Sequence, residues 1–460
     1  MKSEIAVMKA SVKKLSLDDL IFHRRGSFLV RLIYAIFGFA LCLFFRRIEL
    51  VNSENLPEKS GLIFVSNHPN ALIDPALIFI ALPRRIAFLA KSTLFKMPVL
   101  GFLVRAVGAL PLYRRQDAGA DVSKNQETFS VARRLLKSGG AIALFPEGVS
   151  HNSPKLLPLK TGAARIALGA VSTGQNPATL DLQIVPVGLF YTNKTTFRSE
   201  ALLYFGEPFP VTPVELDGDG QPPKEAVRRL TSQIEEALRR VTLNAESEAA
   251  LSTARIAGDV FTSTTPEREN LAERLALLQK FVAEPLGAEE NLEKRLAEYD
   301  KKLGEHGIEP EFLALAQYSK WFIFRQGARR LRRLLIFAPL AVLGAVVHFP
   351  AYQLCKFLAF LQTRKGDFDM ASTVKVLAGI VLMPLTWLVF ASVLHFYFDW
   401  RAALISIPFS FLCGYVALRT LEEIEELRGW AKAILLFIRR REKFLRLLAE
   451  RRRLFEKVKK

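Results

Sequence analysis

The fold is decided by one stretch of the sequence, Gly61-Leu-Ile-Phe-Val-Ser-Asn-His-Pro-Asn-Ala-Leu-Ile-Asp-Pro75. Its first residues form a short continuous apolar run, which is typical of a buried strand. The run ends on Asn67-His68, and Asp74 follows six residues after the histidine. Polar residues at the carboxyl end of a buried strand lie where α/β sheets place their reactive groups. The stretch therefore favours a strand, then a loop that carries chemistry, then a helix.

Two interpretations of His68 and Asp74 stay open at this point. In the first, the loop is a polar turn in which Asp74 is the N-cap of a helix and Pro75 takes the first helical position. In the second, His68 is a general base, because an unperturbed histidine titrates near neutrality, and Asp74 orients its ring. Asp74 can serve both purposes.

Strand-like runs alternate with helical patterns between about residues 48 and 211. The runs are 61–67, 85–91, 106–113, 141–145, 184–191 and 201–209. This alternation predicts an α/β layered domain with a central mixed sheet. Pro186 lies inside one of the runs, which favours an edge or bulged strand there.

A second polar loop follows the run that ends at residue 145. Its Pro146-Glu147-Gly148 turn holds Glu147 at the end of a strand, beside the place where we expect the first strand to leave His68. Thr161 opens a helix directly after Lys160, and a helix start preceded by lysine can bind phosphate. Taken alone, such a loop is far more often an ordinary turn.

The run 106–113 is followed by Arg114 and Arg115. We expect its strand to lie beside the strand of His68 in the sheet. The planar fork of arginine matches phosphate oxygens, although paired arginines are more often only a solvated strand end.

Together, these stretches resemble the four sequence blocks of the glycerolipid acyltransferase superfamily in order and spacing. The blocks here are Asn67-His68 to Asp74, Gly108 to Arg114, residues 145–148 and residues 185–187. The resemblance covers about residues 50–210.

Two departures from the usual blocks narrow the resemblance to one branch. Five residues separate His68 from Asp74 where the family usually has four, and the third block continues with Val149-Ser150 rather than Thr-Arg. Both features look most like the glycerol-3-phosphate and dihydroxyacetone-phosphate acyltransferases that carry extra membrane segments after the catalytic domain.

The resemblance implies a reaction and roles for particular residues. His68, oriented by Asp74, would deprotonate an acceptor hydroxyl that attacks the carbonyl of an acyl thioester directly. The implied substrate-binding residues are Arg114 and Lys160 for the acceptor phosphate, Glu147 for the glycerol, and Asn67 and Gly148. Acyl-CoA or acyl-ACP would be the co-substrate, and we expect no cofactor and no metal. Glycerol-3-phosphate is the expected acceptor, with lysophosphatidic acid or another lysophospholipid as the alternative.

The charge of the chain points to a membrane partner. The formal net charge is +19, and residues 320–460 carry 25 basic and 10 acidic side chains, whereas residues 51–319 carry 30 and 31. The basic excess flanks apolar runs, which is typical of a cytoplasmic membrane face. Because the neutral middle has no basic and aromatic groove, we expect no nucleic-acid partner.

Apolar segments occur near both ends of the chain. Arg31 interrupts residues 28–45, which favours a helix or hairpin that anchors without crossing, and no cleaved signal peptide is expected. Residues 376–398 are long enough to span a bilayer, and residues 402–418 follow as the second arm of a hairpin. Residues 334–361 contain two prolines, and basic residues precede and follow the whole region. If both flanks are cytoplasmic, this segment is a re-entrant loop or two short spans.

These patterns predict five parts. They are a membrane-anchoring segment (1–47), an acyltransferase domain (48–215), an amphipathic helical region (216–325), a transmembrane region (326–420) and a basic amphipathic tail (421–460). The three cysteines lie in apolar runs without metal-ligand spacing, so we interpret them as packing residues. The predicted partners are a lipid bilayer, an acyl thioester and a glycerol phosphate, with the catalytic domain on the cytoplasmic face. A hypothesis of another class is a non-catalytic basic membrane scaffold.

Overall fold

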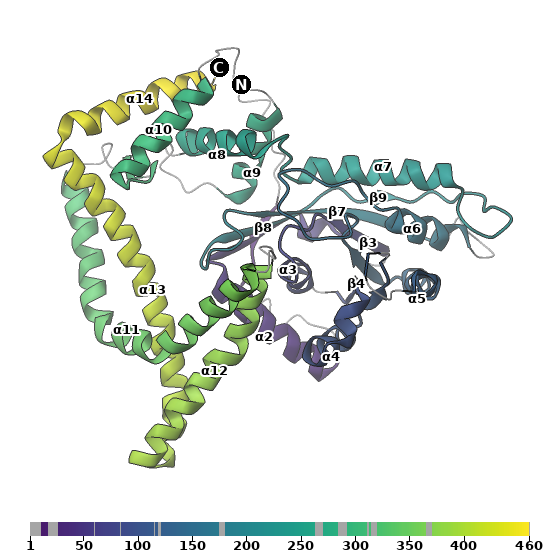
Figure 1. The fold of residues 1–460 in the computed structure, drawn as a ribbon, viewed down its shortest axis with the longest axis horizontal. Coiled ribbons are helices and arrows are strands. Elements are labelled where there is room, and N and C mark those ends of the chain that lie inside the picture. The colour runs from purple at the N-terminus through teal and green to yellow at the C-terminus, as the bar shows by residue number, and fades with distance from the viewer. Residues whose placement is uncertain are drawn as a thin grey trace. The chain divides into compact units, whose positions relative to one another are not determined.

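A computed structural model gives the fold (Figure 1). It describes residues 11–16, 26–58, 60–82, 84–114, 116–117, 121–173, 180–262, 270–283, 292–310, 312–313, 320–364 and 370–459. The chain divides into two compact units. The first contains residues 1–244 and 362–376, and the second contains residues 245–361 and 377–460.

The first unit is built on a mixed sheet. Within the described residues its strands are β1 (Val12–Lys14), β2 (Arg47–Val51), β3 (Gly61–Ser66), β4 (Ile86–Lys91), β5 (Leu110–Leu112), β6 (Ala141–Leu144), β7 (Leu182–Tyr191), β8 (Glu200–Phe205) and β9 (Phe209–Pro210). Their order is β1-β2-β8-β7-β3-β6-β4-β5, with β9 paired to β7. The strands from β7 to β5 run parallel, and β8 is antiparallel to β7. The mixed α/β sheet expected from the alternation of runs is confirmed.

Helices pack on this sheet because its central strands are apolar on both faces. The helices are α2 (Phe28–Phe44), α3 (Ile73–Ala81), α4 (Pro98–Ala106), α5 (Asn125–Lys137), α6 (Gly162–Ser172) and α7 (Lys224–Val241). One continuous core joins buried side chains of β3, β6 and β7 to the inner faces of α5, α6 and α7. β3 is buried along its whole length, which fixes the start of the loop that carries His68.

The structure corrects two expectations about strands. Of the two alternatives for the strand that contains Pro186, the edge strand is wrong, since β7 lies between β3 and β8. The bulge is the alternative that fits, because one extra residue lies on the partner side between the pairs Ile184–Phe209 and Val187–Phe205. β7 tolerates Pro186 because the carbonyl of Pro186 accepts a hydrogen bond from Gly206, in the gap between β8 and β9. The backbone nitrogen of Pro186, which has no hydrogen to donate, points to the same side as its carbonyl. On that side the hydrogen-bond ladder is interrupted between β8 and β9, so no acceptor is left without a donor from β7. In addition, β5 does not lie beside β3, because β6 and β4 lie between them.

Residues 28–44 form a single helix, α2, rather than a hairpin. At 17 residues it is shorter than the candidate membrane spans. Its inner face contacts α3, where the rings of Tyr34 and Phe79 lie 4.4 Å apart, while Phe28 on the same helix is 77% exposed. One apolar face is therefore packed and another is left uncovered, as expected of a helix at a membrane interface.

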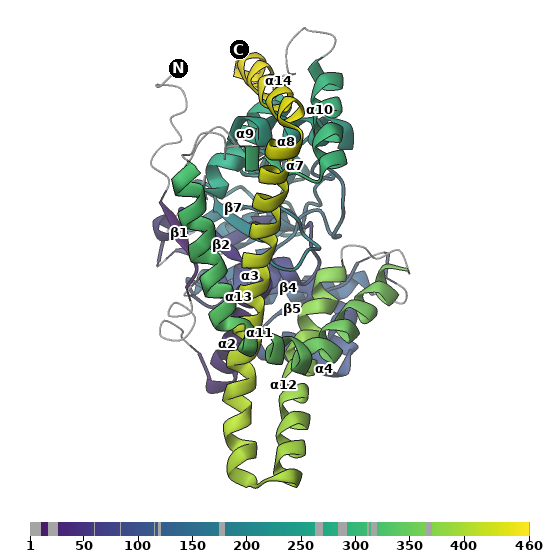
Figure 2. The same cartoon turned by 90° about the vertical axis from the view of Figure 1, so that its left-hand side faces the viewer.

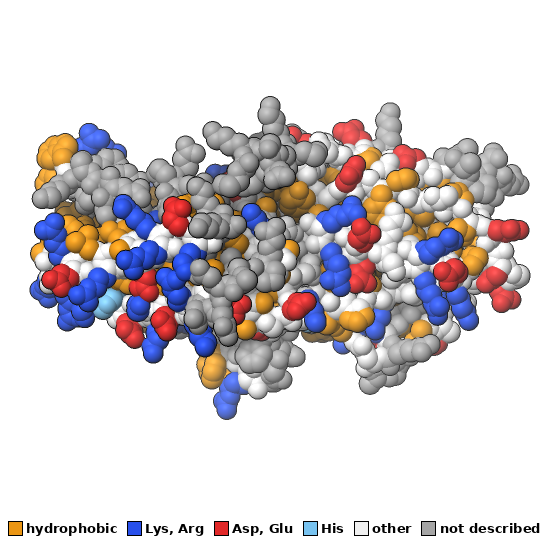
Figure 3. Space-filling model, turned by 90° about the horizontal axis from the view of Figure 1, so that it is seen from above, with side chains coloured by type: hydrophobic (Ala, Val, Ile, Leu, Met, Phe, Trp, Pro, Cys, Tyr) orange, Lys and Arg blue, Asp and Glu red, His pale blue; other side chains and the backbone are white. Residues whose placement is uncertain are grey.

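The second unit is helical. In the described ranges it contains α8 (Glu248–Thr262), α9 (Leu271–Ala283), α10 (Leu292–His306), α11 (Lys320–Thr363), α12 (Ala371–Tyr397), α13 (Trp400–Arg439) and α14 (Arg441–Lys459), of which α11 and α12 each contribute one end to the first unit. Charged side chains of both signs are interspersed on the face shown in Figure 3. Three of these helices, α11, α12 and α13, are long and apolar enough to cross a membrane.

Residues 334–361 are helical throughout, and their entry into the membrane as a re-entrant segment or as two short spans stays a prediction. They lie within the single helix α11, which contains Pro339 and Pro350 and is visibly bent in Figure 1. Proline removes one backbone hydrogen bond and kinks a helix without ending it. Helices α12 and α13 form the expected hairpin (Figure 2).

A partly buried hydrogen bond joins two of the apolar helices, α11 and α12. The Trp387 indole N–H of α12 donates to Nε2 of His348 on α11, at 2.7 Å. The other ring nitrogen of His348 lies 2.8 Å from the carbonyl of Gly344. A polar group within an apolar layer is stable when its hydrogen bonds are made internally, and His348 meets that condition.

We predict that Gly188→Ala destabilises the first unit. A Cβ at Gly188 in β7 would lie 1.8 Å from the carbonyl oxygen of Val241, at the end of α7. Overpacking of this kind costs about 1–3 kcal/mol, so the midpoint of thermal unfolding in detergent should fall by several degrees. Gly162→Ala is the matched control, because its Cβ would enter open space at the start of α6. Equal midpoints for both variants would contradict this packing.

Candidate active site

Two neighbouring parallel strands bring the site together. Val65 of β3 lies opposite Leu144 of β6. The chain leaves β3 toward His68 and leaves β6 toward Glu147 at the same edge of the sheet. The expected proximity of these two residues is confirmed, since the backbone N–H of His68 donates to Oε1 of Glu147 at 3.0 Å.

The histidine and aspartate of the first loop form a hydrogen-bonded pair. Nδ1 of His68 lies 2.8 Å from Oδ2 of Asp74. Because an ionised carboxylate only accepts hydrogen bonds, Nδ1 carries the proton and Nε2 has the free lone pair. The imidazole stacks on the ring of Phe145 at 4.0 Å, and its side chain is 17% exposed. His68 is thus held with one ring edge fixed and the other open to a reactant.

Asp74 is fully buried and its carboxylate is satisfied on both oxygens. Oδ2 also accepts the N–H of Asn70 at 2.7 Å, and Oδ1 accepts the hydroxyl of Tyr191 at 2.6 Å. Burial and the adjacent Asp74 charge raise the pKa of Tyr191, so this phenol remains a donor over the working pH range. The N-cap interpretation of Asp74 is wrong, because the cap of α3 is Leu72 and Asp74 lies in the first helical turn.

Glu147 joins the two loops through its buried carboxylate, which is 2% exposed. In addition to the N–H of His68, it accepts the N–H of Leu157 at 2.8 Å and the Nε2 proton of His151. These contacts assign Glu147 a positioning role in the structure. Its expected contact with the glycerol of a substrate stays a prediction.

His151 is a site residue that the sequence interpretation missed. Its Nδ1 accepts the N–H of Ser153 at 3.1 Å, which places the ring proton on Nε2, facing Glu147. Its backbone N–H donates to the carbonyl of His68 at 3.1 Å. Since both ring nitrogens are engaged, His151 orients the loops and leaves His68 as the histidine with a free nitrogen. The four-residue spacing between Glu147 and His151 is the sequence feature that could have indicated this contact.

Asn67 fastens the end of β3 to β7. Its side-chain amide donates to the carbonyl of Leu189 at 3.0 Å, and its side-chain oxygen accepts the N–H of Leu189 at 2.8 Å. The nitrogen and the oxygen of the Asn67 side chain therefore continue the hydrogen bonding between β3 and β7 beyond Ser66, the last residue of β3. A contact of Asn67 with substrate stays a prediction.

A basic cluster lies next to the Glu147 turn. Gly148 has φ +78°, a conformation that favours glycine, and its carbonyl accepts Nη1 of Arg114 at 2.7 Å. A Cβ at Gly148 would touch the stem of Lys160. The structure thus brings Arg114, Gly148 and Lys160 together, although Arg114 follows the distant strand β5. Arg115 lies outside the described residues.

Asp117 holds the guanidinium of Arg114 in place. It accepts Nε of Arg114 at 3.1 Å and Nη2 at 2.9 Å, and it also pairs with Lys91 at 3.2 Å. The hydrogen bonds from Arg114 lower the pKa of Asp117, so the pair stays ionised at neutral pH. Three of the five N–H donors of a guanidinium are used in these contacts, and the remainder can meet an anion.

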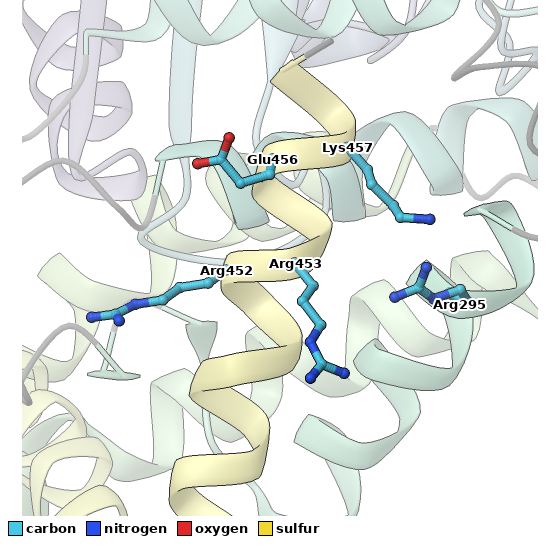
Figure 4. Close-up of a pocket in the computed structure, with 5 residues that line it drawn as sticks. All are labelled: Arg295, Arg452, Arg453, Glu456 and Lys457. Carbon is cyan, nitrogen blue, oxygen red and sulfur yellow. The ribbon is translucent and has the colours of Figure 1, made fainter.

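A separate open cleft of about 540 Å³ lies between α10 and α14 in the second unit. Its lining residues are Arg295, Arg452, Arg453, Glu456 and Lys457, and Arg453 and Lys457 lie on the side of α14 toward Arg295 (Figure 4). This lining has no histidine, serine, threonine or cysteine. Among the described residues, no group of three or more His, Cys, Asp or Glu side chains could hold a metal ion.

Comparisons with known proteins place this site in a family. Residues 47–189 match the sequence model of the acyltransferase family. Glycerol-3-phosphate O-acyltransferase 2 of Saccharomyces cerevisiae is 28% identical over 293 residues, covering 60% of this chain and 39% of the relative. The chloroplastic 1-acyl-sn-glycerol-3-phosphate acyltransferase BAT2 of Brassica napus is 30% identical over 165 residues, covering 35% of this chain and 43% of the relative.

A solved structure is also similar. It is the crystal structure of the 1-acyl-sn-glycerophosphate acyltransferase PlsC from Thermotoga maritima, with a TM-score of 0.33 and 22% identity, and the match covers 47% of this chain and 82% of that chain. The chain spans less than half the length of both curated relatives. The matched segment begins at β2 and ends within β7, and it contains His68, Asp74, Arg114 and Glu147. Residues 47–189 therefore form a domain that matches the acyltransferase family.

Proposed function

We propose that this chain is a membrane-bound O-acyltransferase of phospholipid biosynthesis. It transfers a fatty acyl group from an acyl thioester to a hydroxyl of glycerol-3-phosphate. The observation that carries the proposal is the 2.8 Å pair of His68 and Asp74, with Nε2 of His68 left as acceptor. A non-catalytic scaffold needs no such buried pair, and the pair is held by several further hydrogen bonds.

The chemistry follows from this arrangement. Nε2 of His68 takes the proton of the acceptor hydroxyl while its oxygen attacks the thioester carbonyl. The tetrahedral intermediate collapses with cleavage of the C–S bond, and the imidazolium returns the proton to the departing thiolate. Asp74 stabilises the imidazolium that forms in between. The new ester bond forms directly on the acceptor, so the reaction requires no acyl-enzyme.

The basic cluster supports a phosphate-bearing acceptor. Arg114 is held by Asp117 and by the Gly148 carbonyl, and Gly148 follows directly on Glu147, which contacts the backbone of His68. A phosphate bound by Arg114 and Lys160 would therefore lie close to the base.

Lysophosphatidic acid is the second candidate acceptor. It offers the same phosphate and a free hydroxyl, and the Brassica relative carries this substrate in its name. Glycerol-3-phosphate is favoured because the yeast relative, named for it, matches a longer part of the chain. In both reactions the product is a lipid, which fits the apolar helices α11, α12 and α13.

The test is an acyl-transfer assay with the full chain in detergent or liposomes. Labelled acyl-CoA or acyl-ACP is combined with glycerol-3-phosphate, dihydroxyacetone phosphate or lysophosphatidic acid, and we expect the largest kcat/KM with glycerol-3-phosphate. His68→Ala should lower kcat by about 10²–10⁴, which is the usual contribution of a general base.

His306→Ala is the matched control for His68→Ala, since His306 ends α10 in the other compact unit. It should retain wild-type turnover. A His68→Ala enzyme with near-wild-type activity would overturn the mechanism, and inactivity of the folded wild type with every donor and acceptor would favour the scaffold.

For the acceptor site, we predict that Arg114→Lys raises KM for the phosphate-bearing acceptor roughly tenfold, because lysine cannot copy the planar fork. KM for the acyl donor should change little. Arg134→Lys on the exposed face of α5 is the control. If Arg114→Lys and Arg134→Lys behave alike, the phosphate site must be sought elsewhere.

For the orientation, we propose that the catalytic domain and the carboxyl-terminal tail lie on the cytoplasmic face, with the basic residues that flank the apolar helices. Arg24 and Arg25, which belong to these flanks, lie outside the described residues. In a chain without native cysteines, Gln126→Cys and Glu442→Cys should be protected from an impermeant thiol reagent in intact cells. Phe398→Cys, beside the turn between α12 and α13, should be labelled. Labelling at residue 126 or 442 would refute this orientation.

A further inference from the structure

The loop between His68 and Asp74 contains a strained residue. Ala71 has φ +36°, in the left-handed region that residues other than glycine rarely adopt. Such a conformation persists only where surrounding contacts hold it. The contacts of residues 69–72 therefore decide how firmly the catalytic pair is positioned.

Part of the support comes from the loop that follows β7. The side-chain amide of Asn70 donates to the carbonyl of Lys194 at 3.1 Å, and Nζ of Lys194 donates to the carbonyl of Pro69 at 2.9 Å. Within the loop, the N–H of Ile73 donates to the carbonyl of Asn70 at 3.0 Å. These contacts fasten the first half of the strained loop.

The other support comes from the first turn of α12, which is about 300 residues away in the sequence. The N–H of Leu72 donates to Oγ1 of Thr373 at 3.2 Å. Ser372 donates its hydroxyl to the carbonyl of Lys194, which also accepts from Asn70. Ser372 is fully buried and Thr373 is 1% exposed. Two buried hydroxyls thus contact both the catalytic loop and the loop that supports it.

Lys375 adds a third contact in the same turn, since its Nζ donates to the carbonyl of Thr195 at 2.7 Å. Residues 362–376 cluster with the acyltransferase unit rather than with the other helices. The same helix continues as a candidate membrane span. The polar first turn of α12 therefore contacts the loops of the acyltransferase unit, whereas the apolar remainder of the helix is the candidate membrane span.

We propose that Ser372 and Thr373 are positioning residues of the acyltransferase site. They hold the strained loop of His68 and Asp74 from the first turn of α12, so that these two contacts set the turnover rate. This inference rests on the proposed function for its kinetic part, and it makes a separate structural claim about the loop. Neither residue touches substrate or the reacting atoms in this proposal.

Thr373→Val is the decisive variant, because valine keeps the shape of threonine and removes the acceptor for the N–H of Leu72. A buried N–H without a partner disfavours the native loop. We expect kcat to fall roughly tenfold with KM for donor and acceptor nearly unchanged. Thr373→Ser, which keeps the hydroxyl, should restore most of the rate, and Ser372→Ala should lower kcat in the same way.

The same helix offers matched controls. Within the part of the chain that the structure describes, the hydroxyls of Thr386 and Ser392 donate inside α12, to the carbonyls of Leu382 and Leu388. Thr386→Val and Ser392→Ala should leave kcat unchanged. The midpoint of thermal unfolding of every variant in detergent separates loss of positioning from loss of folding.

Hydrogen exchange gives a readout that does not depend on activity. In full-length protein in detergent, Thr373→Val should speed exchange of the peptide covering residues 69–74, and Thr386→Val should not. Equal protection of this peptide in the two variants would overturn the inference, whatever the enzyme does. If exchange rises and the wild type acylates no acceptor, the loop contact stands and the proposed function fails. If the wild type is active and Thr373→Val matches Thr386→Val in kcat, the positioning role is refuted while the proposed function stands.

Discussion

The parallel pairing of β3 with β6 is the constraint on which the site depends. It places the ends of two buried strands at one edge of the sheet, so that a carboxylate leaving one strand can meet a backbone amide leaving the other. Glu147 occupies that position and is almost fully buried. A buried carboxylate is stable only when its oxygens are hydrogen-bonded, and here each hydrogen bond comes from a different part of the surrounding loops. The need to satisfy one buried charge thereby orders the whole loop layer around His68.

Two histidines in this layer have opposite tautomers and hence opposite tasks. His68 donates a hydrogen bond from Nδ1–H to Asp74 and keeps Nε2 as an acceptor, whereas His151 accepts at Nδ1 and donates a hydrogen bond from Nε2–H to Glu147. The difference lies in what faces Nδ1, a carboxylate in the first case and a backbone N–H in the second. Identical side chains can thus be a reactive group and a structural link within one site, and their immediate hydrogen-bond partners decide which.

Local patterns predicted most of the first unit and the pair at its centre. The apolar run before His68 and the Pro-Glu-Gly turn are signals within a few residues, and both were sufficient to place His68 next to Glu147. Non-local contacts were not predictable in the same way. The position of β5 depends on the order of strands across the sheet, and the tolerance of β7 for Pro186 depends on where β8 happens to end. Likewise, no residue near Thr373 in the sequence indicates that its hydroxyl contacts Leu72. Helix α11 also continues through Pro339 and Pro350 as a kinked helix, which the local sequence did not predict.

Helix α13 is longer than a bilayer requires. Its 40 residues correspond to about 60 Å at 1.5 Å per residue, whereas the hydrocarbon core is about 30 Å thick. Its first half is apolar, Glu422, Glu423, Glu425 and Glu426 follow, and residues 430–438 are again mostly apolar. If the first half of α13 spans a bilayer, the second half, which begins with the four glutamates, would extend beyond the hydrocarbon core. Helix α14, which follows the end of α13, would then lie outside the hydrocarbon core, and the cationic cleft that it shares with α10 would lie outside it too.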